Sequence, residues 1–292
     1  MQSEPQRVDP RETVAVRAPE RDLVARAVGG DRAAITDVVR LLQDPIYRLA
    51  LRMTGRPADA EDASQEILLR VLGHLDGFRG EARLTTWAYR IGVNYLLNLK
   101  RQSAQETSRA TFDEFGEDLK DGLAEADYLG PEAELLARET RLNCTQAMLQ
   151  CLARDERVAY VLSSVFEVSS EEAAWIVDAT PAAYRKRLER AKKRLGNFMN
   201  ASCGLANPQA ACRCSRRVAR AVELGRVDPR RPAYAAHPVT AGGRTVVEAE
   251  RQMVRLHDAA AVIGSHPDYA APQAKVEVIA GLLHSGRFPL LD

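Results

Sequence analysis

Residues 169–195, SSEEAAWIVDATPAAYRKRLERAKKRL, have the sequence pattern of two short helices separated by a tight turn. Ser169 and Glu172 have the spacing of a capping box, in which the two residues satisfy free backbone N–H groups at a helix start. Thr180 is a favoured N-cap residue, and Pro181 suits the first helical position after it. The first helix is expected to end near Asp178. The stretch therefore predicts a helix-turn-helix unit.

The second helix of this pair is predicted to have an apolar face and a strongly basic face. At about 100° per residue, one side collects the apolar and aromatic positions Tyr184, Leu188, Ala191 and Leu195. Seven basic residues and one acidic residue lie between positions 185 and 194. Such a helix can enter the major groove of DNA, where arginine bonds guanine edges and lysine neutralises phosphate. The alternative is a solvated helix whose charges only keep the protein soluble.

The rest of the chain is also predicted to be helical. Apolar residues recur every three or four positions from Glu20 to about Gln102, and again from Glu132. One helix is expected to begin near Pro57, with acidic residues in its first turn, and another near Thr85. No segment alternates with period two for long, so the predicted fold class is all-α.

The net charge of +1 hides a division of the chain into blocks. Residues 1–102 carry 16 basic and 14 acidic side chains, 103–140 carry 3 and 11, 141–200 carry 10 and 7, and 201–292 carry 12 and 8. The acidic block lacks helical periodicity and indicates a linker that is at most partly helical. We therefore expect a disordered tail at 1–19, a helical domain at 20–102, an acidic linker at 103–134, the helix-turn-helix domain at 135–200, and a cysteine-containing, mostly helical extension at 201–292.

Composition and missing motifs exclude several protein classes. No apolar run approaches the roughly 20 residues that cross a bilayer, and the first residues lack the apolar stretch of a secretory signal. Five cysteines in 292 residues do not make a disulfide scaffold. The chain has no P-loop, GxGxxG, HExxH or nucleophile-elbow motif, so it is not expected to be an enzyme. We expect a cytoplasmic protein that requires no cofactor.

Residues 78–101, FRGEARLTTWAYRIGVNYLLNLKR, interleave aromatic and basic side chains. Such side chains can stack on unpaired bases and bind the phosphates of a single strand. Composition alone leaves open the alternative that these tryptophan and tyrosine residues belong to a core.

Two runs, PADAEDASQEILLRVLGHLDGFRGEARLTTWAYRIGVNYLLNLKR at 57–101 and LARDERVAYVLSSVFEVSSEEAAWIVDATPAAYRKRLERAKKRL at 152–195, resemble bacterial sigma factors of the sigma-70 superfamily. The chain is most similar to the compact extracytoplasmic-function (ECF, group 4) class, which keeps only regions 2 and 4. The resemblance covers roughly residues 20–102 and 135–199. It implies a factor that binds core RNA polymerase, recognises the −35 and −10 elements of a promoter, and assists strand opening.

The resemblance also implies roles for particular residues. The acidic helix resembles the one that docks on the clamp helices of the polymerase β′ subunit, with Asp59, Asp62, Gln65, Glu66 and Arg70. The next loop and helix resemble the part that takes up a flipped base and melts the −10 element, with Phe78, Arg79, Arg83, Thr86, Trp87, Arg90 and Asn94. The helix-turn-helix resembles the −35 reader, with Tyr184, Arg185, Lys186, Arg187, Arg190 and Lys193. The implied partners are core polymerase, including its β flap, and duplex and single-stranded promoter DNA, with an anti-sigma factor left open.

Two features stand apart from the family pattern. Many members have glycine in the helix-turn-helix turn, whereas this chain has Asp178-Ala179-Thr180, which leaves the groove angle open. The acidic linker fits a segment that crosses basic channels meant for nucleic acid, because acidic residues can mimic phosphate. The alternative is a plain solvated spacer.

The extension contains three closely spaced cysteines, Cys203, Cys212 and Cys214. They are candidates for a zinc or copper site or a redox pair, although three ligands are one short of a closed structural zinc site. The alternative is ordinary small core residues, which is also the prediction for Cys144 and Cys151. Helices are predicted at 246–263 and 274–283. The functional alternative is a stand-alone helix-turn-helix regulator with a metal-sensing or redox-sensing tail.

Overall fold

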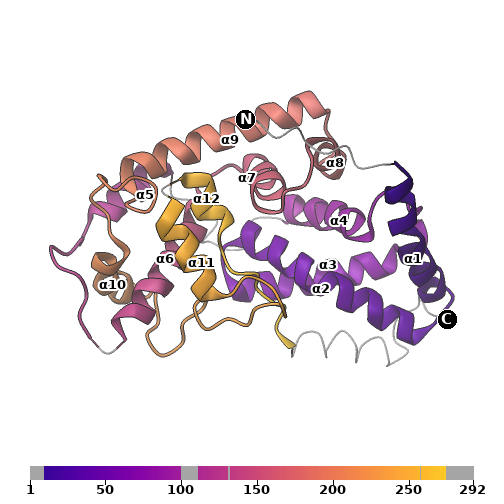
Figure 1. Cartoon of the computed structure of the whole chain (residues 1–292), viewed down its shortest axis with the longest axis horizontal. Helices are drawn as coiled ribbons and strands as arrows, with labels where there is room; N and C mark the ends of the chain where they lie inside the picture. Colours follow the sequence, from indigo (N-terminus) through magenta and orange to yellow (C-terminus); the bar gives the residue numbers. More distant parts are fainter. Residues whose placement is uncertain (1–9, 100–110, 131, 257, 274–292) are drawn as a thin grey trace.

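The computed structural model describes residues 10–99, 111–130, 132–256 and 258–273, and over these ranges the chain is all-α as predicted. Within the described residues no strand forms, and extended pairing is limited to two isolated bridges. Figure 1 shows the first four helices of the chain grouped on one side, the helices of residues 154–202 lying over them, and the last two helices, of residues 246–264, beside them. The first group, here the N-terminal domain, consists of α1 (Pro10–Val28), α2 (Arg32–Thr54), α3 (Pro57–Gly73) and α4 (Leu84–Asn98).

Helix α2 is the centre of the N-terminal domain and packs against α1, α3 and α4. Its side chains from Ala34 to Met53 include twelve buried residues, because apolar positions recur on a broad face. Asp31 caps its start by accepting from the backbone N–H of Ala33 at 2.9 Å. Gly55 ends it with φ of 83°, a conformation that favours glycine. Pro57 then opens α3 as predicted.

The helix-turn-helix domain follows the predicted caps. Ser169 accepts from the backbone N–H of Glu172 at 3.2 Å, and Thr180 accepts from that of Ala183 at 3.2 Å. Asp178 has φ of 51°, so it takes the left-handed conformation in which glycine is common, and Asp is one of the residues that tolerate it. The tight turn therefore forms without glycine. The domain contains α6 (Ala133–Gln150), α7 (Arg154–Tyr160), the π-helical turn η2 (Val161–Val165), α8 (Ser170–Ile176) and α9 (Pro181–Ser202).

The acidic linker contains a helix, α5 (Phe112–Lys120), that begins with a complete capping box of Thr111 and Glu114. Its acidic residues bind arginines of the extension, which contains α10 (Cys214–Glu223), α11 (Val246–Leu256) and α12 (Ala259–Gly264). Asp118 pairs with Arg226 at 2.5 Å, and this partner holds the pKa of Asp118 below its usual range. Asp121 pairs with Arg220 at 2.5 Å. The linker is therefore more than a solvated spacer.

Two boundaries differ from the sequence predictions, and some predicted segments lie outside the described residues. Helix α1 begins at Pro10, so the second half of the segment predicted as a disordered tail is helical. The helix predicted at 246–263 is broken before Asp258, whose carboxylate caps α12 by accepting from the backbone N–H of Ala261 at 2.8 Å. The predicted helix at 274–283 and part of the linker, 103–110, lie outside the described residues.

The N-terminal domain and the helix-turn-helix domain lie against each other, and the C-terminal end of α2 is a main contact between them. The last carbonyls of a helix have no partner within it. Here the carbonyls of Leu51 and Arg52 accept from the side-chain amides of Gln146 and Gln150, at 2.7 and 3.1 Å. The carbonyl of Met53 accepts from the buried Arg157 at 2.5 Å. We call this set of contacts the α2 seam.

Candidate nucleic-acid and polymerase interface

A pocket between α3 and α4 brings several predicted −10 residues together. It has a volume of about 770 Å³ and is lined by Trp87, Arg90 and Asn94 of α4 and by Arg70 of α3. The guanidinium of Arg70 lies 5.0 Å from the centre of the Tyr95 ring. Tyr95 was not among the predicted site residues, although it is one of the aromatic residues interleaved with basic ones over residues 78–101. The pocket combines cationic and aromatic groups suited to an unpaired base.

The loop before α4 is fixed by buried contacts. Phe78 packs edge to face on Trp87 with ring centres 5.6 Å apart, and Phe78 and Thr86 are both buried. The backbone N–H of Leu84 donates to the carboxylate of Glu20 at 2.8 Å. Arg79 and Arg83 are exposed. The predicted −10 residues thus form a graded set, with Phe78 and Thr86 buried, Trp87 and Arg90 half-buried, and the remaining three exposed: Arg79, Arg83 and Asn94.

Arg90 is engaged by the helix-turn-helix domain. Its guanidinium donates to the carbonyl of Trp175 at 2.9 Å, lies 3.4 Å from the carboxylate of Asp178, and sits 4.6 Å from the centre of the Trp175 ring. One wall of the predicted −10 surface is therefore occupied by α8 and the turn after it.

The predicted docking residues lie along α3. Asp59 and Asp62 are exposed, and Gln65 and Glu66 are half-buried. Glu66 pairs with Arg70 at 2.8 Å, one turn apart on the helix. Arg70 also lines the pocket described above, so the docking face and the −10 pocket share an edge.

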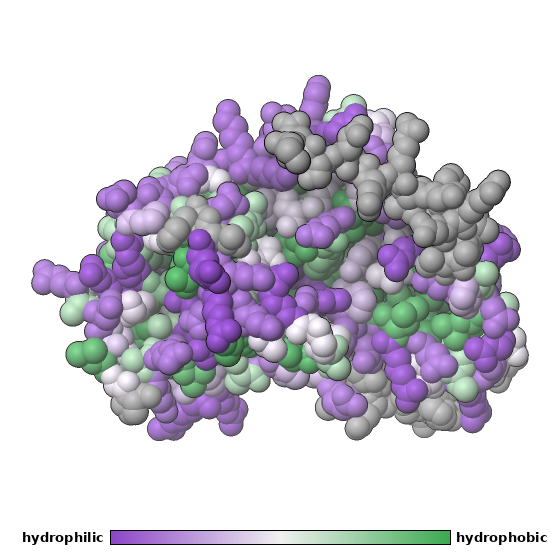
Figure 2. Space-filling view, in the orientation of Figure 1, coloured by the Kyte–Doolittle hydropathy of each residue, from purple (hydrophilic) through white to green (hydrophobic). Residues whose placement is uncertain are grey.

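Helix α9 carries the predicted −35 residues, and Figure 1 shows it along one long edge of the molecule. Figure 2 shows hydrophilic residues gathered along this edge. Arg185, Lys186, Arg190 and Lys193 are exposed, whereas Arg187 is half-buried and lies 3.8 Å from Asp155. Tyr184 differs from the others, because it is fully buried and its hydroxyl donates to the carbonyl of Ala159 at 2.9 Å. Its place in the structure is in the domain core.

Acidic residues of α7 hold part of the basic face of α9. Glu156 accepts from Arg194 at 2.8 Å and from Arg190 at 3.4 Å. Because Glu156 is buried, these pairs orient the arginine side chains along the helix.

The cysteines form no disulfide and, among the described residues, no group of three His, Cys, Asp or Glu is arranged to hold a metal ion. Cys203 and Cys212 are joined by a parallel β-bridge, and burial, followed by the neighbouring thiols of Cys212, Cys203 and Cys214, raises the pKa of the α6 thiol Cys144 well above its usual value. Burial raises the pKa of Cys203 to about 11 and that of Cys212 to about 12. These groups are therefore protonated thiols at neutral pH in the metal-free chain, which lowers their reactivity.

The extension bonds both domains through two segments, 233–240 and 265–271, which we call the clasp. On α2, Asp44 accepts from the Thr240 hydroxyl at 3.0 Å and from the backbone N–H of Ala271 at 2.9 Å. Arg48 pairs with Asp268 at 3.0 Å, and the Tyr47 hydroxyl is hydrogen-bonded to His237.

On α6, the clasp is held by the buried carboxylate of Glu139. It accepts from the backbone N–H groups of Ala233, Tyr234 and Ala235, at 2.8, 3.0 and 2.6 Å for the shortest bond of each. The hydroxyl of Tyr234 in turn donates to the carbonyl of Gly55 at 2.5 Å. One segment of the extension thus joins α6 to the end of α2.

Comparison with known proteins agrees with this geometry. Residues 24–106 match the family model for sigma-70 region 2, and residues 142–195 match that for sigma-70 region 4. The ECF RNA polymerase sigma-E factor of Escherichia coli K12 is 30% identical over 176 residues, which cover 60% of this chain and 91% of the relative. The sigma-E factor of Haemophilus influenzae is 29% identical over 185 residues, covering 63% and 97%.

The chain therefore belongs to the sigma-70 family and, within it, to the ECF sigma factors. It acts in promoter-directed transcription initiation, with core RNA polymerase and promoter DNA as its partners. The alternative of a stand-alone regulator is not favoured, because region 2 is matched as well as the helix-turn-helix region. None of the described helices is long and apolar enough to cross a membrane.

Two solved structures are similar to this chain at lower sequence identity. A structure of CnrH in complex with the cytosolic domain of CnrY has 23% identity and a TM-score of 0.45, covering 62% of this chain and 96% of that one. The sigma factor RpoE of Bartonella quintana, solved with the anti-sigma factor NepR, has 21% identity and a TM-score of 0.40, covering 56% and 94%. The family assignment rests on the sequence matches.

Proposed function

We propose that this sigma factor adopts a closed, inactive arrangement that its own C-terminal extension maintains. In this proposal, residues 20–102 act as the region 2 domain, 135–200 as the region 4 domain, 103–134 as the linker and 201–292 as a regulatory extension. The observation that carries the proposal is the clasp, which bonds α2 and α6 at the same time.

Promoter geometry explains why the closed arrangement would be inactive. The −10 and −35 elements are about 25 base pairs apart, which is about 85 Å at 3.4 Å per base pair. Arg90, a predicted −10 residue, lies 3.4 Å from Asp178 in the turn of the predicted −35 reader. Two surfaces in direct contact cannot occupy both elements at once, so the domains must separate for initiation.

Within the open form, we propose separate tasks for the three surfaces. The exposed acids Asp59 and Asp62 dock on a basic surface of the polymerase, and opposite charge speeds that encounter. The pocket with Trp87, Arg90 and Asn94 takes up an unpaired base of the −10 element. The exposed basic residues of α9, Arg185, Lys186, Arg190 and Lys193, read and position the −35 duplex.

The clasp works within the chain, so closure requires no anti-sigma factor, and one would be an additional partner. We also propose that the protein acts in the bacterial cytoplasm, where core polymerase meets promoter DNA. It carries no bond-making chemistry of its own. The four clustered thiols become a zinc site only through a rearrangement that brings their sulfur atoms together and removes their protons.

The proposal is tested by measuring the separation of the two domains directly. Fluorophores placed through unnatural amino acids at the exposed positions Arg40 on α2 and Asn197 on α9 report the distance between the domains. We expect energy transfer to be high in the free protein and to fall when core polymerase and a duplex promoter are added. Unchanged transfer in a transcribing complex would overturn the closed arrangement.

The base pocket is tested with a promoter that is already open. Trp87→Ala should lower run-off transcription from duplex promoter and leave it close to the unsubstituted level on a template with an unpaired −10 bubble. The matched control is Trp175→Phe, because Trp175 lies outside the pocket and phenylalanine keeps an aromatic ring beside Arg90. Equal loss on both templates would show that Trp87 supports the fold and takes no part in opening.

A further inference from the structure

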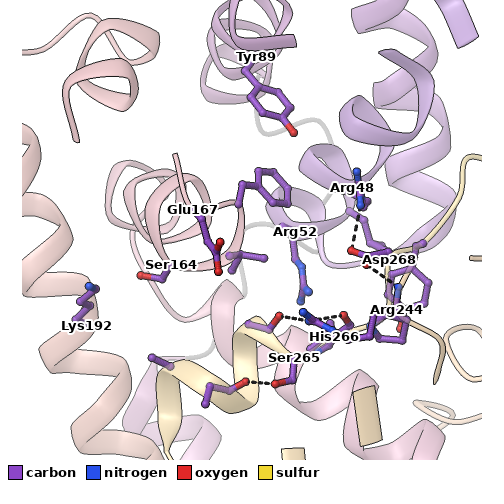
Figure 3. Close-up of a pocket in the computed structure, with 18 residues that line it drawn as sticks. Arg48, Arg52, Tyr89, Ser164, Glu167, Lys192, Arg244, Ser265, His266 and Asp268 are labelled. Carbon is purple, nitrogen blue, oxygen red and sulfur yellow. Dashed lines mark hydrogen bonds and ion pairs between the residues drawn. The ribbon is translucent and has the colours of Figure 1, made fainter. Parts of the chain in front are cut away.

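A second pocket lies where the N-terminal domain, the helix-turn-helix domain and the extension meet. Clasp residues 265–269 form part of its wall, but the proposed function assigns it no ligand. It has a volume of about 620 Å³, within the range of small-molecule sites. Figure 3 shows Arg48 and Arg52 of α2 and Tyr89 of α4 on one side, Ser164, Glu167 and Lys192 on another, and Arg244, Ser265, His266 and Asp268 of the extension closing it. We call it the junction pocket.

The lining of the junction pocket has an excess of positive charge. It contains four cations, Arg48, Arg52, Lys192 and Arg244, and two acids, Glu167 and Asp268. Asp268 is already used, because it pairs with Arg48 at 3.0 Å and accepts from the backbone N–H of Arg244 at 2.7 Å. An anion in the pocket would balance the remaining charge.

The two inner arginines donate to neutral acceptors. Arg52 is buried and donates to the amide oxygen of Gln146 at 3.0 Å, and burial lowers its pKa to about 10. The guanidinium of Arg244 donates to the carbonyls of Gly264 and His266 at 2.7 and 3.3 Å. Planar guanidinium groups that retain positive charge next to a cavity match the geometry of a carboxylate or a phosphate.

Four lining residues carry a buried polar atom that has no hydrogen-bond partner among the described residues. These atoms are Nε of Arg48, Oγ of Ser164, Nδ1 of His266 and the hydroxyl of Tyr269. His266 and Tyr269 are each 2% exposed. A buried polar group without a partner costs about 1 to 3 kcal/mol, so four such groups in residues that line one cavity favour a polar occupant.

The hydrogen bonds of His266 show what it offers to an occupant. The Thr145 hydroxyl donates its proton within α6, to the carbonyl of Arg141 at 2.8 Å. Its oxygen therefore accepts from Nε2 of His266, 2.7 Å away. Burial holds the pKa of His266 well below its usual value, so the ring is neutral and Nδ1 is an acceptor. His266 thus adds one unpartnered acceptor that suits a hydroxyl to a lining that also supplies cationic donors.

The backbone of one wall is unusual in two ways. Ser164 and Val165 belong to the π-helical turn η2, a form that occurs mostly as short insertions at functional sites. Glu167 has φ of 56°, in a region that non-glycine residues seldom adopt. Both features are at the pocket, and strained backbone of this kind clusters at ligand sites.

We propose that the junction pocket binds a small organic anion that also carries a hydroxyl group. Its carboxylate or phosphate would lie against Arg52, Arg48 and Arg244, and its hydroxyl would donate to Nδ1 of His266. Because the site is complete only when all three parts of the chain meet, the ligand binds the closed form and stabilises it by mass action. This last step rests on the proposed function, in which the closed form is inactive, and makes the ligand a repressor of transcription.

The binding step is tested on the full-length chain by isothermal titration calorimetry with four probes. Malate and ribose 5-phosphate each combine an anion with a hydroxyl, whereas succinate and inorganic phosphate lack an alcohol hydroxyl. We expect malate or ribose 5-phosphate to bind at least about tenfold more tightly than its partner lacking the alcohol. The tighter of the two distinguishes a carboxylate ligand from a phosphate ester. No heat from any of the four would overturn the site and leave a water-filled cavity.

Two variants and two matched controls separate the site from adventitious binding. Arg52→Gln and Tyr269→Phe should each lower the affinity about tenfold or more, and Tyr269→Phe removes a single oxygen in case Arg52→Gln fails to fold. The controls are Arg40→Gln, an exposed arginine of the same helix, and Tyr128→Phe, an exposed tyrosine of the linker. Equal affinity in all four would contradict the proposal.

Transcription provides the separate test of the consequence. If the anion binds as described and also lowers run-off transcription, both the site and the closed inactive form are supported. If it binds and transcription is unchanged, the site stands and the proposed function of the closed form fails. If it does not bind while opening the clasp raises transcription, the closed form stands and the junction site fails.

Discussion

Asp44→Ala is expected to activate this sigma factor. The Asp44 carboxylate accepts two hydrogen bonds from the clasp, from Thr240 at 3.0 Å and Ala271 at 2.9 Å. Its surroundings are half-buried, so we take each bond at about 1 kcal/mol, below the full value for a charged acceptor. Loss of both costs the closed form about 2 kcal/mol, or about 30-fold in the ratio of closed to open protein.

The effect on activity follows from that ratio. If the closed form is favoured by about 100 to 1, the substitution lowers the ratio to about 3 to 1 and raises the open fraction from about 1% to about 25%. Single-round run-off transcription with limiting core polymerase should then rise by about 25-fold. The matched control is Asp37→Ala on the same helix, because Asp37 is exposed and, within the described part of the chain, its ion pair is with Arg40, one turn away at 3.5 Å.

A clasp that loosens without raising transcription would refute this mechanism. Hydrogen exchange of residues 265–271 reports whether the clasp has loosened, independently of transcription. Faster exchange in Asp44→Ala with transcription equal to that of Asp37→Ala would show that the clasp does not limit activity.

Three further predictions follow from the same structure. Burial lowers the pKa of His237 to about 4, so the closed form keeps its full stability above about pH 6.5 and loses it as the pH falls toward 4. Between pH 7.5 and 5 the ratio of closed to open protein should therefore fall by up to about 30-fold, as measured with the fluorophore pair on α2 and α9. The variant His237→Gln should reduce that fall. A signal that is flat over this range would contradict it. The pKa values of Cys203 and Cys212 are raised to about 11 and 12, so iodoacetamide at pH 8 should alkylate these two thiols more than 100-fold more slowly than a free thiol. If mass spectrometry finds them modified at the free-thiol rate, they are exposed. Arg185→Ala should weaken run-off on promoters that depend on a −35 element and spare a control promoter without one, and equal loss on both would argue against groove reading.

The helix-turn-helix was predictable from sequence because its signals are local. Ser169, Thr180 and Pro181 sit within a few residues of the backbone groups that they satisfy, and the structure has each cap where the sequence placed it. Position 178 was the uncertain point, and aspartate fills it in a left-handed conformation. The break at Asp258 also had a local signal, since an aspartate inside an apolar helical run is a candidate N-cap.

The clasp and the junction pocket could not be predicted in the same way. Asp44 meets Thr240 and Ala271 across roughly two hundred residues of chain, and no periodicity reports such a contact. The junction pocket draws its lining from three separate parts of the chain, each ordinary when considered alone. Cys144 shows the same limit, because its spacing from Cys151 indicates a helix face and gives no sign of the three distant thiols beside it.

The α2 seam allows the two domains to separate without leaving unsatisfied hydrogen-bonding groups. The donors that cross it, Gln146, Gln150 and Arg157, meet carbonyls that any helix end also presents to water. When the domains separate, water can take over both halves of each bond, so each bond contributes only about 1 kcal/mol to closure. A contact made of interlocked apolar side chains would expose apolar surface on each domain at every opening. The seam limits that exposure without abolishing it, because elsewhere the domains meet through apolar groups: Tyr89 of α4 stacks on Phe166 with ring centres 5.5 Å apart, and one buried apolar cluster includes residues of both domains.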